Sequence, residues 1–266
     1  MPINPSLLTS LQCFWSPATN TFSFPESFMT PTVFDVFALL SLHPMGVLAH
    51  PLMVVGTGPD DDIVNGVPLS YNDLIKHMKG AGASPVSYKE ECCFYLLWIC
   101  KFLAFTSSKR VINYYLPIAR CLANGVPIDM SLFLLGELYR AMFLLSTEPK
   151  QSHGGPIWLI QMWAYFYFPS IAPELHPTIV PWSYGEAWIH AKFPKEKGIP
   201  SFPTYFKLFG DSSRRRLPEE FMPFKARKYG FEDFQQFSSQ SFFRGDAAWG
   251  AYLQSRDLVV IRSTQF

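Results

Sequence analysis

The chain has 266 residues, of which 48% are hydrophobic and only 16% are charged. A chain of this composition buries a large core, which excludes an intrinsically disordered protein. The formal net charge is +1, but the charges are unevenly distributed. The first Lys or Arg is Lys76, whereas residues 192–228 hold ten Lys or Arg against four acids. This asymmetry indicates either an anion-binding face or two oppositely charged surfaces that meet.

Cysteine usage and the N-terminal sequence indicate a reducing compartment. The five cysteines are odd in number and none has CxxC spacing, so neither a disulfide framework nor a zinc site is expected. No basic segment precedes the first apolar run, and a secretory signal peptide is therefore not expected. We expect a protein of the nucleus, or alternatively the cytoplasm, that is not secreted.

The first 46 residues predict a short strand followed by a helix. Residues 21–24 alternate between polar and apolar after a turn-rich cluster, which is the period of a half-buried strand. Thr32 and Asp35 have the spacing of a capping box, at the start of a helix that ends before Gly46. Its buried face should consist of Val33, Val36, Phe37 and Leu40.

Two further helices are expected to begin with capping boxes. Ser70 with Asp73, and Ser87 with Glu90, have the required three-residue spacing. The second capping box should begin a long buried helix over residues 88–105. The side chains expected to stack along its buried face are Phe94, Leu97, Trp98 and Phe102.

Helical segments follow over residues 116–122 and about 129–145. Pro117 is expected to start or kink the first of them, and Gly125 suits its C-terminus.

The stretch GGPIWLIQMWAYFYFPSIAP, residues 154–173, leaves almost no polar face and predicts a central buried helix. The segment before Pro169 is shorter than the ~20 residues that a membrane span needs. Gly154 and Gly155 should permit a close backbone approach or a tight turn, with Pro156 at the first helical position.

Prolines and aromatic residues dominate the second half, which is expected to cover the core as irregular structure. Helices are expected there only over 184–193 and 203–209, with short strands over 221–224 and 258–262. The fold class is therefore mainly α, with a multi-helix core, a short N-terminal β element and small C-terminal strands. We expect one unit over 1–266, with a helical core over 7–173 and a second half over 174–266 that is trimmed from a longer protein.

Three ordered patterns resemble the plant mobile domain family, which is also described as aminotransferase-like. They are FW.P.T.TF.FP from Phe14, TPT..DV..LL.L...G from Thr30, and GGP..L.Q.WA....P from Gly154. The segments YKEECCFYLLWICKFLAF and YYLPIARCLANG are similar to two other parts of the family. Motif residues that we expect to be structural are Trp15, Thr32, Asp35, Gly46, Gly154, Gly155 and Trp163.

The resemblance implies a non-enzymatic nuclear protein-interaction domain. Family members are implicated in silencing of transposable elements, genome stability and meristem maintenance, and they act with a serine/threonine phosphatase similar to protein phosphatase 7. No membrane, cofactor, metal or small-molecule substrate is expected. The candidate partner surface consists of exposed aromatic residues in the second half, namely Trp182, Tyr184, Trp188 and Phe193.

The basic segment 192–228 offers an alternative, nucleic-acid binding or nuclear targeting. Its candidate residues are Arg214, Arg215, Arg216, Lys225, Arg227 and Lys228. Three consecutive guanidinium groups in a polar context are expected to be exposed and can contact phosphates. A solvated loop whose arginines pair with Glu219 and Glu220 is the simpler interpretation.

Enzymatic functions have little support in the sequence. No HExxH, GxSxG, P-loop or paired-cysteine motif occurs. The pattern that a pyridoxal-phosphate aminotransferase fold requires, alternating strands and helices, is also missing. A vestigial transposase or nuclease remains the second alternative, because it needs only carboxylates gathered around divalent ions.

Overall fold

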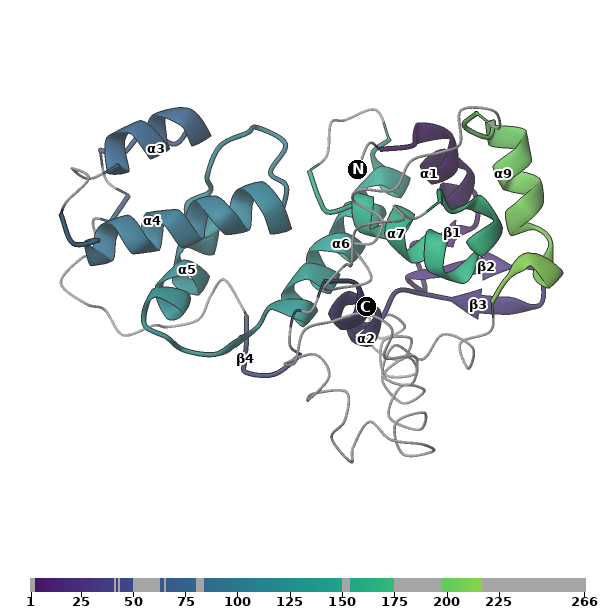
Figure 1. The fold of residues 1–266 in the computed structure, drawn as a ribbon, viewed down its shortest axis with the longest axis horizontal. Coiled ribbons are helices and arrows are strands. Elements are labelled where there is room, and N and C mark those ends of the chain that lie inside the picture. The colour runs from purple at the N-terminus through teal and green to yellow at the C-terminus, as the bar shows by residue number, and fades with distance from the viewer. Residues whose placement is uncertain are drawn as a thin grey trace. The chain divides into compact units, whose positions relative to one another are not determined.

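In the computed structural model, the described residues are 3–40, 42, 44–49, 63–64, 66–79, 84–149, 154–174 and 198–216. They form a mainly helical protein with small sheets (Figure 1), which confirms the predicted fold class. The chain divides into two compact units, residues 1–42 with 157–266, and residues 43–156. These boundaries differ from those expected from the sequence, and the single family unit over 1–266 stays a prediction.

The first unit begins with a helix that the sequence analysis missed. Helix α1 spans Pro5–Gln12, and its N-cap Asn4 accepts a hydrogen bond from the backbone N–H of Leu7 at 3.1 Å. Proline at the first turn and asparagine at the N-cap are both helix-start signals. From the sequence, only a strand and a later helix were expected in the first 46 residues.

A three-stranded antiparallel sheet follows, in the order β1-β2-β3. Its strands are β1 (Trp15–Ser16), β2 (Thr21–Phe24) and β3 (Ser27–Met29). Phe22 pairs with Trp15 on one side and with Met29 on the other. The predicted strand over 21–24 is confirmed.

Helix α2 (Val33–Leu40) starts with the predicted capping box. The backbone N–H of Thr32 donates to Asp35 Oδ2 at 2.7 Å, and the backbone N–H of Asp35 donates to Thr32 Oγ1 at 3.3 Å. The prediction of a single buried face was wrong, because every residue from Phe34 to Leu39 is buried while Val33 and Leu40 are half-buried. A helix enclosed on several sides needs no polar stripe.

The core of the first unit is built around α7 (Trp158–Tyr167), where every residue from Leu159 to Phe168 is buried. The Trp163 ring stacks on Phe22 of the sheet, with centroids 5.2 Å apart. The predicted central buried helix is confirmed, although it begins two residues after Pro156.

The last described helix of this unit is α9 (Phe202–Phe209), which packs beside α1 (Figure 1). Asn4 connects these elements through buried hydrogen bonds. Its backbone N–H donates to Gln161 Oε1 at 2.7 Å, and its side-chain amide donates to the Tyr205 hydroxyl at 2.6 Å. The polar side chain of α7 is therefore satisfied inside an apolar core.

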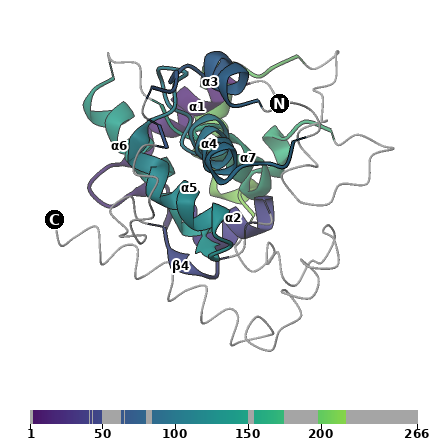
Figure 2. The same ribbon diagram turned by 90° about the vertical axis from the view of Figure 1, so that its left-hand side faces the viewer.

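The second unit contains four α-helices among its described residues: α3 (Tyr71–Met78), α4 (Tyr88–Trp98), α5 (Leu116–Ala123) and α6 (Met130–Thr147). The side chains of Ser70, Ser87 and Asp129 cap the N-termini of α3, α4 and α6. Helices α4 and α5 lie side by side in both views (Figures 1 and 2). A π-helical turn, Ile99–Leu103, extends α4 toward the expected end of this helix.

Close backbone approaches also hold the second unit together. Strands β4 (Val47–Leu48) and β5 (Ile128–Asp129) pair in parallel. A Cβ on Gly154 would overlap the carbonyl oxygen of Phe105, and Gly155 combines a φ of 135° with a position against Ala141. Residues with a side chain do not fit these positions, so the predicted close approach at Gly154 and Gly155 is confirmed.

Candidate functional site

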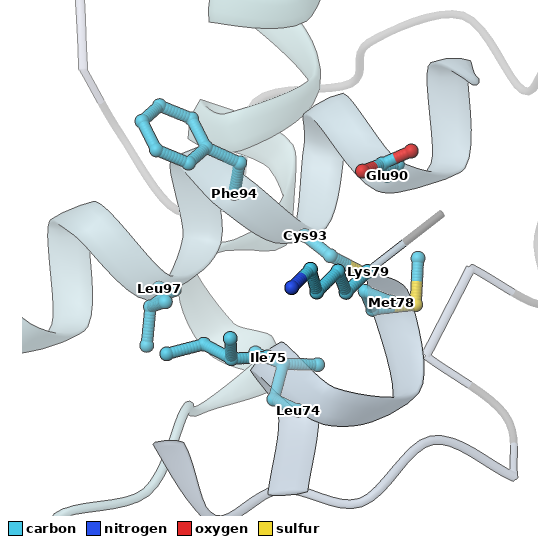
Figure 3. Close-up of a pocket in the computed structure, with 8 residues that line it drawn as sticks. All are labelled: Leu74, Ile75, Met78, Lys79, Glu90, Cys93, Phe94 and Leu97. Atoms are coloured by element: carbon cyan, nitrogen blue, oxygen red, sulfur yellow. The ribbon is translucent and has the colours of Figure 1, made fainter. Parts of the chain in front are cut away.

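The second unit has an apolar groove between α3 and α4, with a volume of about 210 Å³ (Figure 3). We call it the α3/α4 groove. Its lining residues are Leu74, Ile75, Met78, Lys79, Glu90, Cys93, Phe94 and Leu97. Leu74 and Cys93 are buried at its base, whereas Ile75 and Phe94 are 45% and 60% exposed. Large apolar side chains that remain this exposed on neighbouring helices are typical of a binding surface.

The groove is open because α4 turns Cys92, Cys93 and Leu96 toward the core and leaves Phe94 at the surface. This buried face differs from the one predicted. Cys92, Cys93 and Leu96 are buried, while Phe94 and Phe102 are exposed. The prediction that Phe94, Leu97, Trp98 and Phe102 form the buried face was therefore wrong. The helix is apolar on both faces, and cysteine is small and readily buried. The face with the larger side chains was therefore predicted to be buried, whereas the face with the two cysteines is the buried one.

Only two of the lining residues are charged, Lys79 and Glu90. In Figure 3 the Lys79 side chain extends into the space between the helices, and Glu90 lies on α4. Burial raises the pKa of the Cys93 thiol, and the neighbouring Cys92 raises it further. The thiol is thus protonated at neutral pH and is a poor nucleophile. The groove offers an apolar surface with one charge of each sign.

The predicted basic cluster is only partly exposed. Arg214 is exposed, and its Nε lies 3.4 Å from Asp211 Oδ2. Arg215 and Arg216 are half-buried. The Arg215 guanidinium lies over the Phe24 ring, 5.8 Å from its centroid, and the backbone N–H of Arg216 donates to the Tyr167 carbonyl at 2.7 Å.

The expectation of three exposed guanidinium groups was therefore wrong for Arg215, whose guanidinium packs on an aromatic ring. The other members of the proposed cluster, Lys225, Arg227 and Lys228, lie outside the described residues. The same is true of the aromatic partner surface, Trp182, Tyr184, Trp188 and Phe193.

Three of the buried or half-buried acidic residues make structural contacts. Asp35 and Asp129 are helix-start acids, and the buried Glu137 binds Tyr115 and Arg140. In the part of the chain that the structure describes, no three His, Cys, Asp or Glu side chains are grouped so that they could hold a metal ion. Helix α6 has the length and composition to cross a membrane, a property that core helices share, and half of it is buried.

Comparison with known proteins identifies the family. The model of the plant mobile domain matches residues 1–208. The chain belongs to the plant mobile domain family. The match includes all of the second unit and much of the first, so the motif resemblance is confirmed well beyond the three patterns that suggested it.

Two relatives of this plant mobile domain come from Arabidopsis thaliana. One, named serine/threonine-protein phosphatase 7 long form homolog, is 28% identical over 176 residues, which cover 60% of this chain and 13% of the relative. The other, named Protein MAIN-LIKE 2, is 26% identical over 221 residues. These cover 74% of this chain and 31% of the relative. The chain thus spans less than a third of either relative. No solved structure matches.

The family-motif residues of this plant mobile domain occupy structural positions. Trp15 and Trp163 both contact Phe22, and Thr32 and Asp35 form the capping box. Gly46 has a φ of 124°, and a Cβ there would overlap the backbone of Pro127. Of the motif positions expected to be structural, none lines the α3/α4 groove.

Proposed function

We propose that this plant mobile domain is a non-enzymatic protein-interaction domain that acts in the nucleus. The α3/α4 groove is the observation that carries this proposal. The biological context is the one expected for the family, namely silencing of transposable elements, genome stability and meristem maintenance.

The groove has the properties of a site for an amphipathic helix. Such a helix places apolar side chains at three- and four-residue spacing into a groove between helices. Leu74 and Cys93 provide a buried apolar base, and Ile75 and Phe94 provide exposed walls. Lys79 and Glu90 complement an acidic and a basic residue that flank the apolar anchor of the partner.

A phosphatase similar to protein phosphatase 7 is the partner class that we propose. Support comes from the relative named serine/threonine-protein phosphatase 7 long form homolog, which contains a region similar to this chain. A region similar to this chain therefore occurs within a protein that carries a phosphatase name.

The test is isothermal titration calorimetry of the purified chain with a purified plant protein phosphatase 7. We expect saturable binding, and we expect Phe94→Ala to weaken it by about tenfold or more, because aromatic anchors dominate interface energetics. Phe102→Ala is the matched control, since Phe102 is 49% exposed and lies outside the groove.

Equal weakening by both substitutions, or by neither, would exclude the groove as the docking site. Failure of the unaltered chain to bind the phosphatase would exclude this partner class. The groove would then be tested with a nuclear protein of another class.

The alternative of nucleic-acid binding through residues 192–228 gains no support from the described arginines. Arg214 is the exposed one among Arg214, Arg215 and Arg216, and it pairs with Asp211. Phosphate binding would have to compete with that pairing.

A further inference from the structure

A second cavity of about 490 Å³ lies within the second unit, beside α6. We call it the α6 cavity. Its volume is in the range of small-molecule sites, which run from ~300 to ~1,000 Å³. The polar end is formed by Tyr115, Glu137 and Arg140, and the apolar part by Leu48, Ile112, Tyr114, Leu132 and Phe133. None of these residues belongs to the α3/α4 groove.

Arg140 is held in one orientation by a buried carboxylate. Its Nε and one Nη donate to the same oxygen of Glu137, at 3.0 and 2.9 Å. The other carboxylate oxygen accepts a hydrogen bond from the Tyr115 hydroxyl at 3.0 Å. Glu137 is 9% exposed, so it serves to orient the arginine and is not open to a ligand.

The Arg140 guanidinium keeps donors for a ligand. It carries five N–H groups, and two of them face Glu137. About half of the side chain, 52%, is exposed. Burial lowers the pKa of Arg140, but the charge of Glu137, the hydrogen bonds to Glu137 and the interactions with Tyr115 together outweigh this and raise the pKa overall, which keeps the group charged. A preorganised guanidinium of this kind binds carboxylates in a bidentate geometry.

Charge decides the ligand class. Arg140 is the one cation among the lining residues, and the one acid, Glu137, is already bound by two partners. An amine would meet the arginine without a free carboxylate to compensate. An anion would meet unused donors. The site therefore favours a negatively charged group.

The rest of the cavity favours an apolar body attached to that group. Tyr114 and Ile112 are 54% and 41% exposed at the cavity. The Tyr115 ring packs edge-on against both Tyr114 and Phe133, with centroids 5.3 and 5.6 Å away. This aromatic cluster offers a surface on which a flat or aliphatic group can pack.

We propose that the α6 cavity binds a small organic carboxylate with an aromatic or aliphatic body, and that Arg140 binds its carboxylate. The inference is independent of the proposed protein partner, because the α6 cavity and the α3/α4 groove have no residue in common.

The test uses three probes of nearly equal shape, 3-phenylpropionate, 3-phenylpropionamide and 3-phenylpropylamine. Binding to the full chain is followed by ligand-observed NMR and calorimetry. We expect the carboxylate to bind at least about tenfold more tightly than the amide, since charged hydrogen bonds are stronger than neutral ones. Equal binding of carboxylate and amide, tighter binding of the amine, or no binding of the carboxylate would overturn the proposal.

Two variants locate the site. Arg140→Gln should reduce carboxylate affinity to that of the amide, while Arg110→Gln, at an exposed arginine outside the cavity, should leave it unchanged. Because Arg140→Gln also leaves Glu137 without its charged partner, the protein can lose stability.

Gly136→Leu separates binding from stability. Gly136 lines the cavity within helix α6, and a Cβ there meets no atom within 4 Å. The leucine side chain should project into the cavity and obstruct binding, while the loss of a mid-helix glycine should raise the melting temperature. Unchanged carboxylate binding in this variant would place the ligand elsewhere and contradict the proposal.

Discussion

Asp35 shows how a helix-capping residue becomes part of the core. The Thr32 backbone N–H and hydroxyl donate to one carboxylate oxygen at 2.7 and 2.8 Å, and the Tyr167 hydroxyl donates to the other at 2.8 Å. The carboxyl group is 2% exposed. Burial raises its pKa from 3.8 to about 6, and the hydrogen bonds from Thr32 and Tyr167 offset part of that increase.

The raised pKa predicts that Asp35 makes stability depend on pH. The folded state holds the proton more tightly than the unfolded state between pH 4 and 6, so the free energy of unfolding falls as pH rises through this window. A shift of about two units corresponds to at most roughly 3 kcal/mol. Asp35→Asn preserves the shape and can keep the three contacts, and it should remove this dependence.

The measurement is urea unfolding of both proteins at pH 4 and pH 7. The difference between the variant and the unaltered chain isolates Asp35 from the other titrating groups. An identical pH profile in the two proteins would show that the carboxyl does not titrate in this window.

Sequence spacing predicted half of this arrangement. Thr32 and Asp35 are three residues apart, and a capping box is recognisable from that alone. Tyr167 lies 132 residues further along the chain, and no local pattern connects it with Asp35. Arg215 illustrates the same limit, since its position over Phe24 follows from tertiary contacts.

At the scale of elements, the sequence does not show which face of an apolar helix is buried. Helix α7 posed no difficulty, because it is buried on all sides. Helix α4 is apolar on two faces, and α5 packs beside it. The buried face contains Cys92, Cys93 and Leu96, whereas Phe94 remains at the surface. Periodicity alone cannot distinguish these faces, since both have helical spacing.

The two faces of α4 should respond oppositely to truncation. Leu96 is fully buried, and Leu96→Ala should lower the free energy of unfolding by about 2–5 kcal/mol. Phe94→Ala, two residues away and exposed, should change it by no more than about 0.5 kcal/mol. Urea unfolding monitored by circular dichroism measures both. Comparable losses at the two positions would mean that Phe94 is a core residue and that the α3/α4 groove is filled.

At the scale of the whole molecule, the chain consists of two compact units, and residues 43–156 are inserted between the two segments of the first. The helix starts at Ser70 and Ser87 were predicted from the spacing of their capping boxes, and the structure confirms them. The insertion of residues 43–156 was not predicted, because hydrogen bonds such as those of Asn4 with Gln161 and Tyr205 join distant segments without a sequence signal. Both candidate sites lie in the inserted unit, and each is lined in part by a segment that resembles the family, residues 88–105 at the α3/α4 groove and residues 114–125 at the α6 cavity.

The most direct test of the protein-interaction account is hydrogen exchange of the full chain with and without the purified phosphatase. Docking in the α3/α4 groove should slow exchange in residues 71–79 and 88–98, because a bound partner suppresses local opening. Residues 5–12 of α1, in the other unit, serve as the internal reference. Slowed exchange confined to α3 and α4 is the predicted result, and a bound complex in which both helices exchange as in the free chain would contradict the account.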